Sequence, residues 1–388
     1  MVRKIIDEVR AEGDYALLRY ARALDGFDRA SFRVEPDELD VAQAGMTSEL
    51  REAVHTASAN IRAVAELQLP GSCMAEMEPG RRIGQIVRPV ETVCAYVPSG
   101  RYPLVSTLMM TVIPAQVAGV RNICVTTPRA APEILGTASL LGLPKLFLLG
   151  GAQAIAAFAL GTETIPRADR IVGPGNIYVT AAKKLLAGEA SIDFVAGPTE
   201  IVIIARDGNP VWIAADMLAQ AEHDTQACAL LLTTSSSLAS AVAEEIETQL
   251  SSLSTASVAR EAIKRNSAII LVDSVEQAME LSNRYAPEHL SIDNPSLLEK
   301  IEHAGSVFIG SNSPEAAGDY ASGPNHVLPT AGAARGRGGL SAADFVKVIS
   351  VQELSGQALQ NLAPAVTTLA RAEGLEAHAR SVEVRRHG

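Results

Sequence analysis

The stretch Val93-Cys-Ala-Tyr-Val97 opens a series of short, uniformly apolar runs, each followed by a segment with the period of a helix. Strands that are apolar on both faces and alternate with helices are typical of a parallel sheet covered by helices on both sides. The sequence therefore predicts a doubly wound α/β unit. Its strands are expected at 93–97, 122–126, 145–149 and 170–172, and its helices at 104–118, 131–141, 152–160 and 179–186.

A second series of the same kind follows along the chain. Strands are expected at 200–204, 229–233, 267–272 and 306–309, and helices at 211–223, 238–250 and 275–285. Two α/β series of similar size predict two Rossmann-like domains that face a cleft. Because such sheets bind ligands at the carboxyl ends of their strands, the cleft is a natural enzyme site. After Gly339 the chain becomes mainly helical, which predicts a small C-terminal segment.

Two amphipathic helices are expected within residues 4–25, on either side of Gly13-Asp14, and a longer alanine-rich helix at 50–67. The stretch 70–89 is rich in Gly, Pro and Met and is interpreted as the crossing into a new unit. The strands that begin at Val93 would then belong to this new unit.

The composition is that of a folded protein, with 47% apolar and 20% charged residues. A net charge of −11 and a pI near 5.2 disfavour nucleic acid as a partner. The uncharged run 102–120 contains prolines and polar residues, so we expect a buried helix and no membrane segment. The charged N-terminus does not resemble a signal peptide, and the four cysteines form no C-x-x-C pair; both favour a cytoplasmic protein.

The run Gly318-Asp-Tyr-Ala-Ser-Gly-Pro-Asn-His-Val-Leu-Pro329 has neither the period of a helix nor the alternation of a strand. Its two glycines and two prolines favour a shaped loop, and Asp319, Tyr320 and His326 are side chains that bind or catalyse when a rigid scaffold holds such a loop. The alternative is a solvated turn. The residues of the loop alone do not decide between the two.

Other candidate groups are spread along the chain. Gln220 and His223 lie three residues apart on an expected helix, where they could bind a divalent metal or serve a structural purpose. Glu288 and His289 form an acid–imidazole pair capable of proton transfer. The turns at 150–151 and 173–176 could bind phosphate at helix N-termini or simply be tight turns. Glu373 and His378 lie five residues apart, and this spacing alone does not indicate a function.

Taken together, five of these runs resemble the signatures of the histidinol dehydrogenase family, in the order of that family. They are Gly150-Gly-Ala-Gln-Ala154, Gly173-Pro-Gly-Asn176, Ala219-Gln-Ala-Glu-His223, Pro287-Glu-His289 and Gly318–Pro329, and the resemblance extends from about Ile5 to Val384. It implies a zinc- and NAD-dependent enzyme that oxidises L-histidinol to L-histidine through L-histidinaldehyde, the last step of histidine biosynthesis. Two NAD molecules are needed because alcohol to carboxylate removes four electrons. The resemblance further implies a homodimer in which the two subunits share the active site.

The resemblance also implies a role for each matching residue. Zinc, one ion per subunit, would be bound by Gln220, His223, Asp319 and, from the other subunit, His378. His289 would take the hydroxyl proton and Glu288 would activate water. The positions that match substrate-binding residues are Thr199, Gln220, His223, His289, Asp319, His326, Glu373 and His378, and those that match NAD-contacting residues are Tyr96, Gln153 and Asn176.

The expected domains follow from these roles. Residues 1–72 and 199–340 would form a Rossmann-like zinc and substrate domain, 73–198 a Rossmann-like NAD-binding domain, and 341–388 a C-terminal tail for dimerisation and the active site.

Two other functions stay open at this point. Relatives with the same fold oxidise other small alcohols, including sulfonated ones, so a paralogous zinc- and NAD-dependent dehydrogenase is the main alternative. A ligand-binding or assembly protein without catalysis is another, although each polar position holds a competent residue type. One departure from the family lies at the site itself, where Thr199 stands in place of the usual serine, which keeps the hydroxyl and adds a methyl group.

Overall fold

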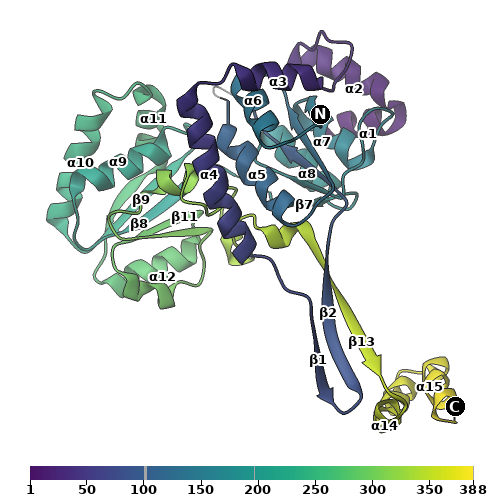
Figure 1. Cartoon of the computed structure of the whole chain (residues 1–388). Coiled ribbons are helices and arrows are strands. Elements are labelled where there is room, and N and C mark those ends of the chain that lie inside the picture. The colour runs from purple at the N-terminus through teal and green to yellow at the C-terminus, as the bar shows by residue number, and fades with distance from the viewer. Residues whose placement is uncertain (100–102, 196, 388) are drawn as a thin grey trace. The chain divides into compact units, whose positions relative to one another are not determined.

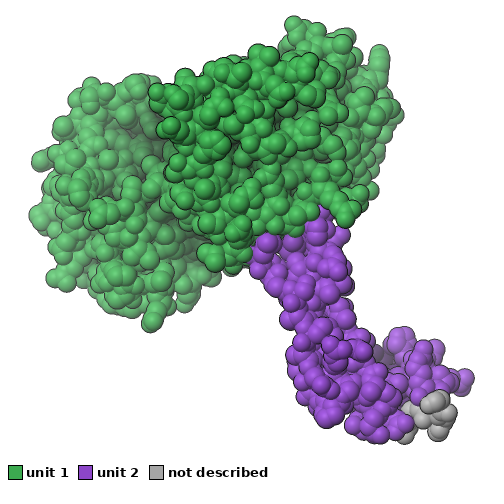
Figure 2. All heavy atoms as spheres, in the orientation of Figure 1, with its two compact units in different colours: residues 1–68, 91–345 green, residues 69–90, 346–388 purple. Residues whose placement is uncertain are grey.

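The computed structural model describes residues 1–99, 103–195 and 197–387. It divides the chain into two compact units (Figure 2). Unit 1 consists of residues 1–68 and 91–345, and unit 2 of residues 69–90 and 346–388. Both parallel sheets lie in unit 1.

The first sheet of unit 1 is parallel, in the strand order β5-β4-β3-β6-β7. Its strands are β3 (Thr92–Tyr96), β4 (Asn122–Thr127), β5 (Leu146–Leu148), β6 (Arg170–Val172) and β7 (Ser191–Ile192). The helices between them are α5 (Val105–Val117), α6 (Pro132–Leu140), α7 (Gly151–Leu160) and α8 (Ile177–Leu186). This alternation confirms the doubly wound fold that the apolar runs predict.

The second sheet is also parallel, in the order β10-β9-β8-β11-β12. Its strands are β8 (Glu200–Ile204), β9 (Cys228–Thr233), β10 (Ala268–Leu271), β11 (His289–Ile292) and β12 (Ser306–Ile309). Its helical elements are α9 (Pro210–Ala221), α10 (Ser236–Leu250), α11 (Ala256–Asn266), α12 (Val275–Tyr285), η2 (Pro295–Lys300), α13 (Glu315–Tyr320), η3 (Ala333–Arg335) and η4 (Ala342–Phe345). The second Rossmann-like unit is therefore confirmed as well (Figure 1).

The N-terminal helices pack on the first sheet, so the assignment of residues 1–72 to the domain of the second sheet is wrong. They are α1 (Val2–Glu12), α2 (Asp14–Tyr20), the π-helix η1 (Ala21–Asp25), α3 (Pro36–Ala44) and α4 (Ser48–Leu67). The apolar face of α1, formed by Ile5, Ile6 and Val9, shares one core with Tyr96 of β3 and Phe158 of α7. Burial of this face against α7 decides which sheet the helix joins.

Unit 2 differs from the expected C-terminal tail. It combines α14 (Gly356–Ala372), α15 (Glu376–Glu383) and η5 (Val384–His387) with a three-stranded antiparallel sheet. That sheet joins β13 (Val346–Leu354) to the hairpin of β1 (Cys73–Glu78) and β2 (Arg81–Pro89). Residues 73–90 therefore belong with the C-terminal residues and not with the first parallel sheet, because β2 pairs with β13 along its whole length.

The uncharged run is a buried helix, as expected. Residues 106–115 of α5 are all buried, while Tyr102 lies outside the described residues. Among the described parts of the chain, the structure contains no helix with the length and apolar character needed to cross a bilayer.

A buried ion pair fixes the turn between β6 and α8. Lys183 of α8 pairs with Asp193, and the two side chains are 4% and 1% exposed. The Lys183 ammonium also donates to the carbonyl of Gly173 (2.9 Å), while Asp193 accepts from the Gly173 amide (2.7 Å). Gly173 has a φ of 108°, and a Cβ there would lie 2.1 Å from the carbonyl oxygen of Tyr96. Glycine is therefore required where this turn meets the end of β3.

Replacing Lys183 with methionine should lower the free energy of unfolding by about 3–5 kcal/mol, because Asp193 would be left buried without its counter-charge. Urea unfolding followed by circular dichroism measures this. Lys184→Met is the matched control, since Lys184 is exposed on the same helix and its loss should change stability by about 0.5 kcal/mol or less. Equal effects of the two variants would contradict the account.

Candidate active site

A buried carboxyl, Glu288, joins two neighbouring strands of the second sheet. Its Oε2 accepts from the hydroxyl of Thr199 (2.5 Å) and from the backbone amide of Glu200 (2.9 Å). Thr199 precedes β8 and Glu288 precedes β11, and these two strands are adjacent and parallel. The cluster therefore lies at the amino ends of the strands, so the expectation of a site at the carboxyl ends is wrong for this sheet.

Burial raises the pKa of Glu288 to about 8, and the hydrogen bonds from Thr199 and Glu200 oppose this rise. The hydroxyl of Thr199 is the group that contacts Glu288, so the threonine keeps the contact that a serine would make. A carboxyl whose pKa lies near the pH at which an enzyme operates can both accept a proton from water and donate one to it.

His289 presents a ring nitrogen without a partner. Its Nδ1 lies 3.2 Å from the carbonyl oxygen of Glu200 and 3.3 Å from Oε1 of Glu315. Its Nε2 is buried and has no hydrogen-bond partner among the described residues. Burial lowers the pKa of His289 to about 4, against the opposing charge of Asp319. At neutral pH the ring is therefore neutral, and with the proton on Nδ1 the bare Nε2 can accept one.

Asp319 lies between two imidazoles. Its Oδ2 is 4.0 Å from Nε2 of His223 and its Oδ1 is 3.8 Å from Nε2 of His289. Two ligand atoms, each about 2.0–2.2 Å from one zinc ion, can be no more than about 4.4 Å apart. Both the His223–Asp319 pair and the His289–Asp319 pair therefore fit a shared metal ion by distance, and imidazole and carboxylate are ligands that zinc takes.

Gln220 is held beside these groups by a residue that the sequence did not single out, Glu315. With the amide turned to satisfy both of its ends, the Gln220 nitrogen donates to both Glu315 oxygens, one of them at 2.9 Å. Its oxygen then accepts from the Glu200 amide (3.2 Å) and lies 2.5 Å from Thr199 Oγ1. Glu315 is 4% exposed, and burial, reinforced by the nearby Asp319 and Glu288, raises its pKa well above the usual range. Its position four residues before Asp319 on α13, one helical turn away, is the signal that could have identified it.

The run 318–329 differs in part from the expected loop. Residues 318–320 complete the short helix α13, and only the following residues lack regular structure. Likewise, α9 ends at Ala221, so His223 lies just beyond the helix on which it was expected. Tyr320 is 60% exposed and contacts none of these groups in the described hydrogen bonds.

His326 and Asn325 hold the rest of this run against α5, a helix of the first sheet. His326 Nδ1 lies 2.8 Å from the carbonyl oxygen of Asp319, and its Nε2 lies 3.4 Å from the hydroxyl of Thr107 on α5. The Asn325 amide donates to the carbonyl of Met110 (2.6 Å), also on α5. Burial lowers the pKa of His326. The run is therefore a rigid connection between the two halves of unit 1 and not a solvated turn.

The three residues expected to contact NAD line one cavity of about 580 Å³ in the first sheet's half of unit 1. Tyr96 ends β3, Gln153 lies in the first turn of α7 and Asn176 caps α8. The strand order reverses between β3 and β6, and ligands of doubly wound sheets bind outside the carboxyl ends of the strands at such a point. Gln153 is 1% exposed and its Oε1 has no partner among the described residues, which suits a bound donor.

Two expected site residues lie in unit 2. Glu373 caps the C-terminus of α14 and His378 lies on α15, and both are exposed. Unit 1 by itself thus supplies three of the four expected zinc ligands, Gln220, His223 and Asp319.

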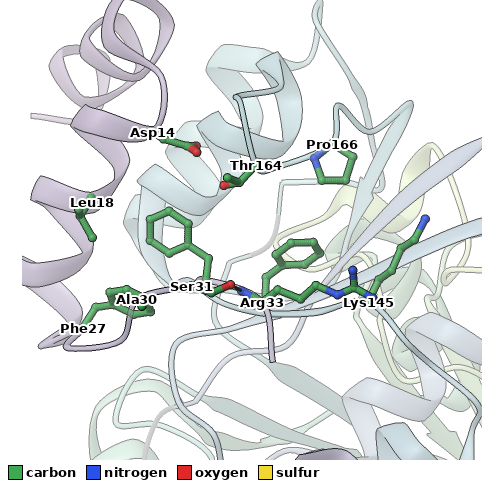
Figure 3. A pocket seen from close by; sticks show the side chains of 11 residues that line it. Asp14, Leu18, Phe27, Ala30, Ser31, Arg33, Lys145, Thr164 and Pro166 are labelled. Atoms are coloured by element: carbon green, nitrogen blue, oxygen red, sulfur yellow. Dashed lines mark hydrogen bonds between the residues drawn. The ribbon is translucent and has the colours of Figure 1, made fainter. Parts of the chain in front are cut away.

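Another cavity, of about 530 Å³, is lined by none of the expected residues (Figure 3). Arg33 and Lys145 lie on one side of it and Asp14 on another. The Arg33 guanidinium donates to the carbonyl of Pro144 (3.0 Å) and the Lys145 ammonium to the side chain of Asn122 (2.8 Å). Because both cations already have partners, we assign the chemistry to the other two sites.

Comparison with known proteins decides the family. A family model described as histidinol dehydrogenase matches residues 1–386. The chain belongs to the histidinol dehydrogenase family. The histidinol dehydrogenase of Thermus thermophilus is 47% identical, over 100% of this chain and 94% of that protein. That of Methanothermobacter thermautotrophicus is 46% identical, over 98% of this chain and 91% of that protein.

Solved structures agree with this family. The crystal structure of histidinol dehydrogenase from Elizabethkingia anophelis matches with a TM-score of 0.96 and 40% identity, over 99% of this chain and 91% of that one. An acetylating aldehyde dehydrogenase from Geobacillus thermoglucosidasius, at 14% identity and a TM-score of 0.52, shares the fold alone. The resemblance inferred from the five runs is confirmed. Because the relatives that match nearly the whole chain are histidinol dehydrogenases, the comparisons do not favour the alternative of a paralogous dehydrogenase that oxidises another alcohol.

The raised pKa of Glu288 predicts how stability changes with pH. The folded protein holds this proton up to about pH 8, whereas in the unfolded chain the carboxyl has an ordinary pKa of 4.5 and releases it there. As the pH rises from 4.5 to 8, the wild-type protein therefore loses stability relative to Glu288→Gln, which cannot ionise.

Thermal unfolding of both proteins, freed of metal with a chelator, measures this effect. The melting temperature of Glu288→Gln minus that of the wild type should be higher at pH 8.5 than at pH 5 by several degrees, since about 1 kcal/mol moves it by roughly 2–4 °C. A difference that is the same at both pH values would show that Glu288 ionises in the folded protein at no cost.

Proposed function

We propose that this protein is an L-histidinol dehydrogenase that converts L-histidinol to L-histidine through L-histidinaldehyde with two NAD, the last step of histidine biosynthesis. One observation carries the proposal. In a chain of this family, the unpartnered Nε2 of His289 and the carboxylate of Asp319 lie 3.8 Å apart beside the buried Glu288. A base, a metal-binding carboxylate and a second proton-transfer group are thus gathered in one cluster.

Gln220, His223 and Asp319 would bind zinc, with His378 supplied by a second copy of the chain. Zinc, when bound, holds and orients the amino alcohol as a template. Glu315 keeps the Gln220 amide in one orientation through the hydrogen bonds between them. Such support around a ligand typically decides metal affinity by 10- to 100-fold.

His289 takes the hydroxyl proton on Nε2 during the first oxidation. Its Nδ1 faces the carbonyl of Glu200, which holds the ring in one orientation. NAD, when bound, accepts one hydride in each of the two oxidations. Glu288 then removes a proton from the water that adds to the aldehyde, a task that suits its pKa of about 8.

The remaining expected residues complete the substrate site. Thr199 and His326 would contact L-histidinol from unit 1, and Glu373 and His378 from the second subunit of a homodimer. Tyr96, Gln153 and Asn176 would contact NAD in their shared cavity. We place the enzyme in the cytoplasm, where its four cysteines, all free in the structure, would stay reduced.

The proposal is tested by offering the zinc-loaded protein L-histidinol and, in parallel, other small alcohols, including a sulfonated one, with NAD. NADH absorbance should rise with L-histidinol at a kcat/KM at least about 100-fold above that of any other alcohol. A sulfonated alcohol as the best substrate would overturn the proposal in favour of the paralogous function.

Asp319→Ala should lose zinc, because the remaining unit 1 ligands cannot replace the only carboxylate of the set. His223→Ala should do the same. Zinc per subunit after gel filtration, measured by plasma emission spectroscopy, should fall from about one to near zero. Asp207→Ala is a suitable control, since the Asp207 side chain is 92% exposed and lies outside the ligand set. Full zinc occupancy in both alanine variants would refute the ligand assignment.

A further inference from the structure

The amino end of α7 is already occupied by groups of the protein itself. The amide of Gly150 donates to Oδ2 of Asp25 (3.2 Å), and the amide of Gly151 donates to the hydroxyl of Tyr96 (3.2 Å). In doubly wound sheets, free amides at such a helix end commonly bind the phosphates of a dinucleotide. Here the Asp25 carboxylate and the Tyr96 hydroxyl already accept from these amides.

Asp25 comes from a segment outside the sheet. It ends the π-helix η1, and Gly26 follows with a φ of 66°, a left-handed conformation that reverses the chain. Its Oδ2 also accepts from Nε2 of Gln153 (2.9 Å). Among the described hydrogen bonds its second oxygen, Oδ1, has none. The carboxylate therefore has acceptor capacity left on the side of the cavity that it lines.

Gln153 supplies an independent sign of a ligand. Its amide nitrogen is used by Asp25, while its Oε1, buried in a residue that is 1% exposed, has no partner among the described residues. A buried acceptor without a donor is costly, so this oxygen calls for a donor group from a ligand. Two acceptors, one on Asp25 and one on Gln153, thus line the same cavity.

Charge in this cavity is sparse. Of the side chains that line it within the described parts of the chain, only those of Asp25 and Arg129 are charged. Arg129 is exposed, whereas Asp25 is partly buried. Water therefore screens the repulsion between Asp25 and a phosphate less than it would screen the same repulsion at the surface. A pair of neutral hydroxyls suits the Asp25 carboxylate, and a phosphate does not.

We propose that Asp25 selects NAD over NADP by accepting the hydroxyls of the adenosine ribose and repelling a 2′-phosphate. In many dinucleotide folds the acidic residue that does this lies in the sheet about 20 residues after the glycine-rich turn. Here the carboxylate would come from the N-terminal helices that pack on the sheet. The inference rests on the proposed function, because it takes this cavity as the cofactor site.

A purely structural role for Asp25 predicts a different outcome. If the carboxylate only caps α7 and orients Gln153, its loss should weaken NAD and NADP alike. If it selects between them, its loss should change their ratio. The ratio of the two affinities therefore separates the two roles.

The experiment measures equilibrium binding of NAD and of NADP to the zinc-loaded protein by titration calorimetry, without L-histidinol. Asp25→Asn keeps the size of the side chain and removes its charge. The preference for NAD should fall at least about tenfold, through weaker NAD binding, tighter NADP binding, or both. Asp28→Asn is the matched control, since Asp28 is an exposed carboxylate three residues away that does not line the cavity, and it should leave the preference unchanged.

An unchanged ratio in a folded Asp25→Asn, judged by its melting temperature, would overturn the inference. Should that variant not fold, Asp25→Ser carries the same test, because its hydroxyl can still accept from Gly150. Failure of the proposed function would look different. A wild-type protein that prefers NAD in binding but does not oxidise L-histidinol would contradict the proposed function and leave the role of Asp25 standing. Turnover of L-histidinol with NADP as readily as with NAD would contradict the role of Asp25 and leave the oxidation of L-histidinol standing.

Discussion

The hydrogen bonds that the Glu288 carboxyl accepts from Thr199 and Glu200 are the interaction on which the candidate active site depends. They connect the amino ends of two parallel strands, β8 and β11, at the position where the order of the second sheet reverses. The same Thr199 hydroxyl contacts the Gln220 amide, so one hydroxyl links the expected metal ligand to the expected base. Because His289 follows Glu288 directly, the start of β11 also fixes the direction of the imidazole.

The cavity and the buried acid cluster lie at opposite ends of their respective sheets. In the first, the cavity lies at the carboxyl ends of the strands, around Tyr96 and Gln153, as is common for doubly wound sheets. In the second, α9 runs back from the carboxyl end of β8 and delivers Gln220 to the amino end, where the buried acids lie. The contacts of Asn325 and His326 with α5 hold the run after α13 against the other half of the unit. These contacts lie within unit 1, which contains both the cavity around Tyr96 and Gln153 and the cluster around Glu288.

The sequence was sufficient for both parallel sheets, because runs such as Val93-Cys-Ala-Tyr-Val97 are apolar on both faces. It was not sufficient to assign the N-terminal helices, since the apolar face of Ile5, Ile6 and Val9 would suit either sheet. The strand β1 was missed because all six of its residues are exposed and its sequence, CMAEME, has no clear alternation. Glu315 was missed because its only signal in the sequence, a spacing of four residues from Asp319, has meaning only once the run around Asp319 is known to begin in a helix. The roles of the zinc and NAD residues came from the family resemblance and not from spacing.

A four-electron oxidation at one site can be recognised by the amount of NADH that forms from a limiting amount of L-histidinol. With excess NAD and zinc-loaded protein, the reaction should end at two NADH per L-histidinol, with L-histidine as the product. An end point of one NADH, with the aldehyde left in solution, would contradict the assignment of Glu288 and His289 to two successive oxidations.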